Sequence, residues 1–236
     1  MRIQELRDSL RGQVPLFEGL SEEALDEILS RGRRHQVGKG IVLFHQGDPA
    51  EGFHLVLAGR LKVAQSSEEG QQVIVRYLGP RQLAGCVAVC GGLPYPATAT
   101  AIEDSWLLQW RRKDLADIAE RWPQIALNAM RIMGGRTREL QERVRELQVE
   151  RVEQRIARAL GRLVVEAGRR TPEGIEIDFP ISRQDLAEMV GTTLHTVSRT
   201  LAAWEQEGIV RSGRQRVMIC DAESLSRIAE GVEARP

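Results

Sequence analysis

Residues 181–199 read ISRQDLAEMVGTTLHTVSR, and they predict two short helices joined by a tight turn. Ser182 stands three residues before Asp185, which is the spacing of a capping box at the start of a helix. Gly191 allows the positive φ that a sharp turn between helices requires, and Thr193 suits the N-cap of the second helix. The pattern is typical of a helix-turn-helix, whose second helix lies in the major groove of DNA.

The residues after the second helix predict a basic β-hairpin. Residues 209–211 and 216–219 form its strands and residues 212–215 its turn, so the hairpin would place arginines beside the DNA phosphates. An arginine can bond to both O6 and N7 of guanine, and a serine can meet a base or a phosphate. The expected DNA-contacting residues are Ser182, Arg183, Thr193, His195, Thr196, Ser198, Arg199, Arg214 and Arg216.

The N-terminal half predicts a different architecture, made of short β-strands. Runs rich in β-branched, aliphatic and aromatic residues recur about every ten residues and are separated by glycine-containing turns. This spacing favours an antiparallel sandwich or barrel. The expected strands lie at 41–44, 53–57, 61–63, 73–75 and 106–110.

Residues 124–147 predict a long helix with a heptad pattern. Apolar positions spaced alternately three and four residues apart are typical of a coiled-coil seam. We expect this seam to join two copies of the chain, although a helix packed on its own domain is the alternative. A second helix at 152–167 is followed by an expected loop that contains Gly168, Pro172 and Gly174. The seam residues are Met130, Met133, Thr137, Leu140, Val144 and Leu147.

Composition narrows the function classes. The formal net charge is zero, so a DNA-binding chain of this kind must concentrate its positive charge locally. Charged residues follow Met1 directly, and the uncharged stretch 82–102 contains Pro94 and Pro96, so neither a signal peptide nor a membrane span is expected. Three cysteines do not make a disulfide framework, which indicates a cytoplasmic setting. No nucleophile–base pair, P-loop or metal motif is visible, and we do not expect an enzyme.

Three segments together carry a family resemblance. Residues 40–50 (GIVLFHQGDPA), 57–63 (LAGRLKV) and 181–199 resemble the Crp/Fnr transcription regulators, and the order of the parts agrees along the whole chain. The resemblance implies an α+β fold with a cyclic-nucleotide-binding-like β-roll (a jelly roll) at 1–122, a dimerisation helix at 123–151 and a winged helix-turn-helix at 152–236. It also implies a homodimer that binds double-stranded DNA under allosteric control by the β-roll. RNA polymerase is the further expected partner, and no membrane is involved.

The reading helix matches the Fnr branch of that family. Ser198 and Arg199 correspond to its Ser-Arg pair, which implies a palindromic operator with half-sites resembling TTG…CAA. His195 stands where that branch usually has a glutamate. A glutamate would accept a hydrogen bond from cytosine, whereas a histidine can donate or accept, so the base preference at this position is open.

The resemblance argues against two effectors. Residues 83–87 (LAGCV) lack the acid that the cyclic-AMP branch uses, and residues 82–110 contain no arginine or lysine to meet a phosphate. Cyclic AMP is therefore not the expected effector. The N-terminal cysteine cluster of the Fnr iron–sulfur sensors is also absent, because Cys86 is the first cysteine. Any effector pocket would involve Gly85, Cys86, Pro96, Ala97, Thr98, Leu140 and Gln141.

The sequence gives only weak indications of a thiol switch or of a haem or metal site. Cys86 and Cys90 would serve as a thiol switch or as haem ligands, but small buried side chains are the commoner role. His35, His45 and His54 recur at strand-like spacing, and a metal or haem site is the less favoured interpretation. The effector thus stays unknown. The alternatives are an effector-independent, redox-responsive or haem-responsive regulator and, less favoured, a cyclic-nucleotide-binding regulatory subunit.

Overall fold

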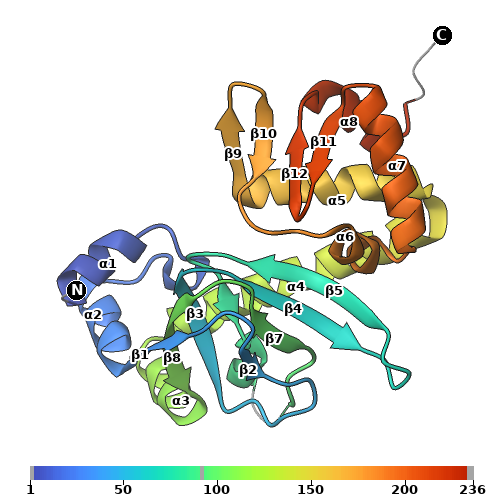
Figure 1. Cartoon of the computed structure of the whole chain (residues 1–236). Helices are drawn as coiled ribbons and strands as arrows, with labels where there is room; N and C mark the ends of the chain where they lie inside the picture. The colour runs from blue at the N-terminus through green and yellow to red at the C-terminus, as the bar shows by residue number, and fades with distance from the viewer. Residues whose placement is uncertain (1–2, 91–92, 233–236) are drawn as a thin grey trace. The chain divides into compact units, whose positions relative to one another are not determined.

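The computed structural model of the chain describes residues 3–90 and 93–232, which form two compact units (Figure 1). The first unit comprises residues 1–71 and 75–140, and the second comprises residues 72–74 and 141–236. The chain combines helices with antiparallel sheets, so the expected α+β class is confirmed. Within the described residues, no helix has the length and apolar character that a membrane span requires.

The first unit is built on two four-stranded sheets. The strand orders are β1-β8-β3-β6 and β2-β7-β4-β5, and the neighbouring strands run antiparallel. The helices of this unit are α1 (Ile3–Leu10), α2 (Glu22–Arg31), α3 (Arg112–Arg121) and the start of α4 (Gln124–Val149), with short 3-10 helices η1 (Pro15–Phe17) and η2 (Cys86–Cys90). The strands are β1 (Arg33–Val37), β2 (Val42–Phe44), β3 (Gly52–Ala58), β4 (Leu61–Ser66), β5 (Gln72–Leu78), β6 (Leu83–Ala84), β7 (Thr98–Ala101) and β8 (Ser105–Arg111).

Strand β3 contributes to both cores of this unit. Its side chains alternate between its two faces, as in any strand, so Phe53 and Leu55 join the core under the helices while Val56 joins the second core. Trp110 of β8 stacks on Phe53 at 4.8 Å between ring centroids and donates its indole hydrogen bond to the Ile28 carbonyl of α2 at 2.7 Å. The N-terminal helices are thereby fixed to the first sheet.

Helix α4 carries an exposed apolar stripe. Met133 and Ile132 are half-buried and pack on the first core, whereas Met130, Leu140, Val144 and Leu147 of the expected seam are exposed. Leu140, for example, is 53% exposed. The exposed large apolar residues of α4 are Leu127, Met130, Leu140, Val144, Leu147 and Val149.

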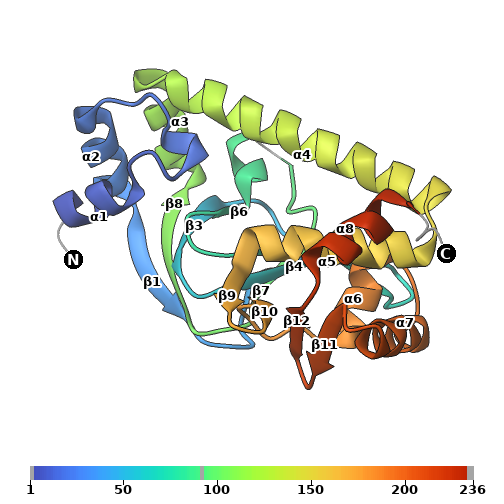
Figure 2. The same cartoon turned by 90° about the horizontal axis from the view of Figure 1, so that it is seen from above.

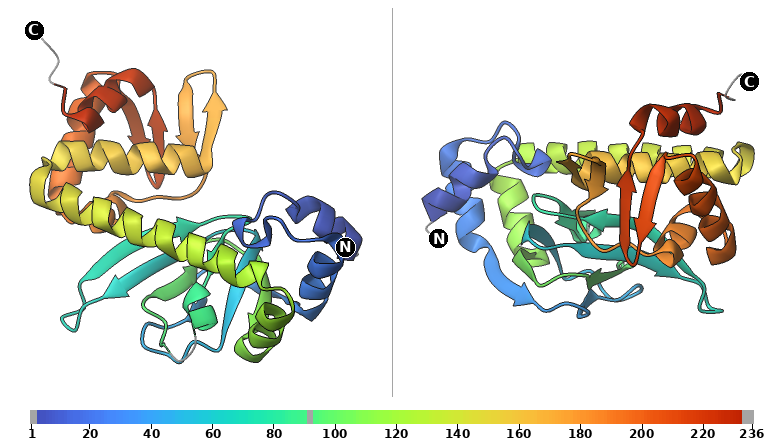
Figure 3. Two further views of the ribbon diagram at one scale, coloured as in Figure 1. Left: turned by 180° about the vertical axis from the view of Figure 1, so that it is seen from behind. Right: turned by 45° about the horizontal axis from the view of Figure 1, so that its top comes forward.

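The second unit packs helices against a four-stranded sheet of order β11-β12-β10-β9 (Figures 2 and 3). Helix α5 contacts both α8 and α6, and its buried residues Ile156, Leu160 and Leu163 belong to the core of the unit. The elements are α5 (Val152–Ala167), β9 (Gly168–Thr171), β10 (Gly174–Ile177), α6 (Arg183–Val190), α7 (Leu194–Gln206), β11 (Val210–Gly213), β12 (Arg216–Ile219) and α8 (Ala222–Glu230).

The prediction of a loop after residue 167 is wrong, because this segment forms the β9–β10 hairpin. Gly174 adopts a φ of 148°, and a Cβ placed there would lie 2.2 Å from the Ile219 carbonyl oxygen. The glycine is therefore needed for close pairing with β12, and not to keep the segment irregular. Strand β9 reads GRRT and has no apolar alternation, so its sequence gives no strand signal.

Candidate nucleic-acid interface and sensor region

Helix α6 begins at the expected capping box. The Ser182 hydroxyl accepts a hydrogen bond from the Asp185 amide at 3.0 Å, and the Asp185 carboxylate accepts one from the Ser182 amide at 2.9 Å. The helix ends at Gly191, whose φ of 66° lies in the left-handed region. Both ends of α6 are thus fixed by local interactions, and the turn into α7 has one well-defined geometry.

Helix α7 presents a polar face at its start. Thr193 is its N-cap, and the Thr193 hydroxyl accepts from the Thr196 amide at 3.2 Å. His195 and Arg199 are exposed and Ser198 is half-buried. On the opposite face, α7 buries the residues Val197, Thr200, Leu201 and Trp204. This orientation leaves the expected base-reading side chains accessible.

Leu194 is a candidate contact that the sequence reasoning missed. This residue opens α7 and is 47% exposed, although it is large and apolar. An apolar side chain at the start of a reading helix can contact the methyl group of thymine. The available signal was its place beside the N-cap, because the first residue of a reading helix points toward the groove.

Arg183 is bonded directly to the β11–β12 hairpin, which is the wing of the helix-turn-helix. Arg183 donates from Nη2 to the Ser212 hydroxyl of β11 at 2.8 Å, and the Ser212 amide donates to the Glu205 carboxylate of α7 at 2.5 Å. These bonds link α6, α7 and the β11–β12 hairpin through one serine. Arg183 therefore has a structural bond in addition to the DNA contact expected of it.

Arg214 and Arg216, the two arginines of the β11–β12 hairpin that are expected to contact DNA, differ in their surroundings. Arg216 donates to the buried carboxylate of Glu176 through Nε at 2.7 Å and also through Nη2, and Arg169 donates to the same carboxylate. Arg214 at the hairpin tip is exposed and has no ion pair within the described part of the chain. The charge of Arg214 is therefore the more available one for a phosphate.

The expected effector-pocket residues of the first unit lie around η2 and β7. Gly85 has a φ of 74°, and a Cβ there would come within 2.9 Å of the Tyr95 ring. Cys86 and Ala97 are buried. The Thr98 hydroxyl accepts from the Gln46 amide at 3.0 Å. Pro96, Leu140 and Gln141 are exposed, and the Cys90 side chain lies outside the described residues.

An arginine of helix α4 brings positive charge to the region around η2 and β7. Arg136 of α4 donates to the Leu83 carbonyl at 3.0 Å. Burial raises the pKa of the Cys86 thiol, and the positive charges of Arg136 and Arg76 offset part of that rise. The absence of arginine and lysine from residues 82–110 therefore does not leave the region without positive charge. The sequence could not show this, because Arg136 lies some fifty residues along the chain.

Two histidines of the first unit lie close together. His35 and His54 have ring centroids 5.7 Å apart, and the Nδ1 atom of each ring is buried without a hydrogen-bond partner. Burial, and to a smaller extent the proximity of His35, lowers the pKa of His54 to about 3. His45 is exposed. Within residues 3–90 and 93–232, no three His, Cys, Asp or Glu side chains are grouped as metal ligands.

Both units of the chain match known protein families. The cyclic nucleotide-binding domain family matches residues 34–121, and the Crp-like helix-turn-helix domain family matches residues 154–228. The cyclic AMP receptor protein of Thermus thermophilus is 33% identical over 218 residues, which cover 92% of this chain and 98% of that protein. The transcriptional activator protein Anr of Pseudomonas aeruginosa is 29% identical and covers 89% of this chain and 84% of its own length.

Solved structures show the same architecture. FixK2 from Bradyrhizobium japonicum has a TM-score of 0.74 at 21% identity, with 87% of this chain and 98% of that chain covered. The catabolite activator protein of Thermus thermophilus has a TM-score of 0.54 at 33% identity, with coverage of 92% and 99%. The proteins that this chain resembles are transcription regulators and not enzymes. The capped helix-turn-helix, the β-roll and these relatives show that the chain belongs to the Crp/Fnr family of transcription regulators.

Proposed function

We propose that the protein binds, as a homodimer, a palindromic operator whose half-sites resemble TTG…CAA. The observation that carries this proposal is the start of α7, where His195 and Arg199 are exposed beside Ser198 above a fully buried inner face. Arg199 forms no ion pair within the described residues, so its guanidinium is available for bidentate bonds to guanine. Leu194 would contact a thymine methyl group next to it.

The exposed stripe of α4 supports a second copy of the chain as partner. Within it, Met130, Leu140, Val144 and Leu147 follow the three-and-four spacing of a coiled-coil seam, and two parallel copies of the helix would bury them together. In this division of labour, residues 1–122 sense, residues 123–151 dimerise and residues 152–236 bind DNA. RNA polymerase is the proposed further partner, because several relatives are named as transcriptional activators.

Control by the β-roll is proposed to depend on an anion bound near Arg136. The arginine lies next to Cys86, and the 33% identical relative is named for cyclic AMP. The segment 83–87 nevertheless has no acid to bind a ribose. Titration calorimetry with cyclic AMP tests this point. Saturable binding that Arg136→Met abolishes would support control by a cyclic nucleotide, whereas no heat of binding would agree with the missing acid and exclude cyclic AMP as the effector.

Selection of bound sequences from random duplex DNA tests the DNA-binding proposal. The purified protein should enrich a TTG…CAA palindrome, whose two halves lie about one helical turn apart. The Arg199→Ala variant should lose the enrichment at one base pair of each half-site. Recovery of sequences without two-fold symmetry would contradict the proposal.

The dimer is tested by sedimentation. Leu140→Asp together with Val144→Asp places charges in the stripe and should halve the sedimenting mass. Arg138→Asp is the matched control, because this residue is exposed on the same helix away from the stripe. A dimer that survives the double change would contradict the seam.

A further inference from the structure

Arg155 connects two helix ends in the second unit. Its Nε atom donates to the Val190 carbonyl at 3.1 Å, and its Nη1 atom donates to the Glu150 carbonyl at 3.2 Å. Val190 is the last residue of α6, and Glu150 directly follows α4. One guanidinium group therefore joins the end of the proposed dimerisation helix to the end of the first helix of the helix-turn-helix.

The position suits a cation for electrostatic reasons. The last carbonyl groups of a helix have no partner within it, and the helix dipole gives that end a partial negative charge. Two such ends would repel each other when close together, because both are partly negative. A positive side chain between them removes this repulsion and donates hydrogen bonds to the unpaired carbonyl groups of both ends. Arg155 lies in the opening turns of its own helix α5, where a cation is unfavourable. The local sequence of α5 thus gives no reason for an arginine at this position.

A second contact lies at the same junction. A Cβ placed on Gly191 would come within 3.1 Å of the Leu147 side chain of α4. Gly191 forms the turn between α6 and α7, and the reading helix starts three residues later at Leu194. A displacement of the end of α4 would therefore act directly on the turn that orients the reading helix.

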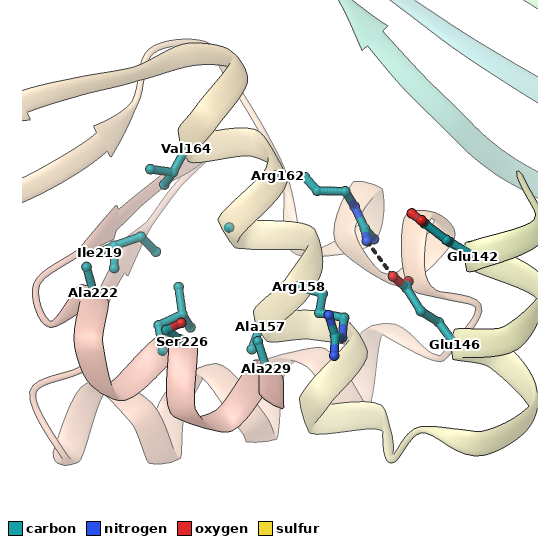
Figure 4. A pocket seen from close by; sticks show the side chains of 12 residues that line it. Glu142, Glu146, Ala157, Arg158, Arg162, Val164, Ile219, Ala222, Ser226 and Ala229 are labelled. Atoms are coloured by element: carbon teal, nitrogen blue, oxygen red, sulfur yellow. Dashed lines mark hydrogen bonds and ion pairs between the residues drawn. The ribbon is translucent and has the colours of Figure 1, made fainter. Parts of the chain in front are cut away.

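Ion pairs on the same side of α5 hold α4 in place. Glu146 pairs with Arg162 at 2.7 Å, and Glu150 pairs with Arg158 at 3.0 Å. Both carboxylates are largely buried. Figure 4 shows the Glu146–Arg162 pair beside a cavity of about 480 Å³ that α4, α5 and α8 line. Here polar bonds adjoin an open space instead of a close-packed apolar contact, so the junction depends on a few directional interactions.

We propose that Arg155 is a positioning residue for operator recognition, which fixes the helix-turn-helix to the end of α4 without touching DNA. This inference rests on the proposed function, because it concerns how the proposed operator is recognised. Its consequence is that sequence-specific binding requires Arg155, whereas binding to random DNA does not. The two half-sites of an operator demand a fixed orientation of both reading helices, but non-specific binding needs only phosphate contacts.

The test compares two DNA probes. Fluorescence anisotropy would measure binding to the operator that the wild type selects and to a random duplex of equal length, over a series of salt concentrations. Arg155→Met keeps the side-chain length and removes both donors. We expect it to weaken operator binding roughly tenfold to a hundredfold, in proportion to two charge-assisted hydrogen bonds. Binding to the random duplex should change less than about threefold, with an unchanged salt slope.

Two further variants complete the design. Arg155→Lys keeps the charge and should restore part of the operator affinity, which a general folding defect would not allow. Arg227→Met removes an exposed arginine of α8 and should leave both affinities unaltered. An equal loss on both probes, or no loss on the operator, would overturn the proposed role of Arg155. Failure of the wild type to select any sequence would instead refute the proposed function itself.

Discussion

His54 lies in the interior of the β-roll, and acid should destabilise the first unit through this residue. It is 4% exposed, and it stacks near Phe44 at 6.1 Å between ring centroids. Burial and the neighbouring His35 lower its pKa from 6.5 to about 3. The unfolded chain therefore binds a proton at a pH where the folded chain does not. Stability is fully present above pH 6.5 and is lost as the pH falls toward 3.

The size of the effect at mild pH depends mainly on the unfolded state. At pH 5 folded His54 is uncharged, while about 97% of unfolded chains carry the proton, given a reference pKa of 6.5. With about 1.36 kcal/mol for each pH unit, the free energy of unfolding falls by about 2 kcal/mol between pH 7 and pH 5. A folded pKa of 4 instead of 3 would give nearly the same loss.

Urea unfolding at pH 7 and pH 5 measures this loss. A Trp204→Phe background removes the tryptophan of the second unit, so the remaining fluorescence reports on the first. His54→Leu removes the titrating ring, and His45→Gln removes an exposed histidine as the matched control. The His54→Leu protein should lose about 2 kcal/mol less than the other two over this interval. Equal losses in all three proteins would refute the assignment of the acid sensitivity to His54.

Three further changes test the DNA-binding unit. Arg199→Ala should cost about 1–3 kcal/mol on the selected operator and far less on random DNA, as competition binding would show. Gly191→Ala should cost about 1–2 kcal/mol in urea unfolding because of its left-handed φ, and adding Leu147→Ala should recover only the part due to the 3.1 Å contact. Ser182→Ala should remove about 1 kcal/mol of stability through the lost N-cap, seen as a lower unfolding temperature.

The helix-turn-helix could be predicted closely because its signals are local. Ser182 and Thr193 cap their helices through residues three positions away, and Gly191 adopts the left-handed turn that the pattern requires. The β9–β10 hairpin could not be predicted, because Gly174 is needed only for its approach to Ile219, more than forty residues later in the sequence. A short-range pattern carries no information about such a partner.

The α4 pattern shows a related limit. The heptad spacing includes Met133 in the seam, and yet Met133 packs on the core of its own unit while Leu140 stays exposed. A long helix with apolar residues on more than one side can serve both its own core and a partner. Spacing alone identifies the helix, and the tertiary packing decides which of its faces remain free.

Two arginines form long-range contacts that could not be predicted from the sequence. Arg136 supplies positive charge beside Cys86 in a segment that contains none of its own, and Arg155 satisfies two helix ends at once. Both side chains come from helices, where an arginine usually indicates a solvated surface. Each of these two arginines donates to a main-chain carbonyl group of another element. A charged residue elsewhere on the surface could not replace that hydrogen bond. Arginines of this kind are therefore the first candidates for residues that fix the local geometry of the unit in which they lie.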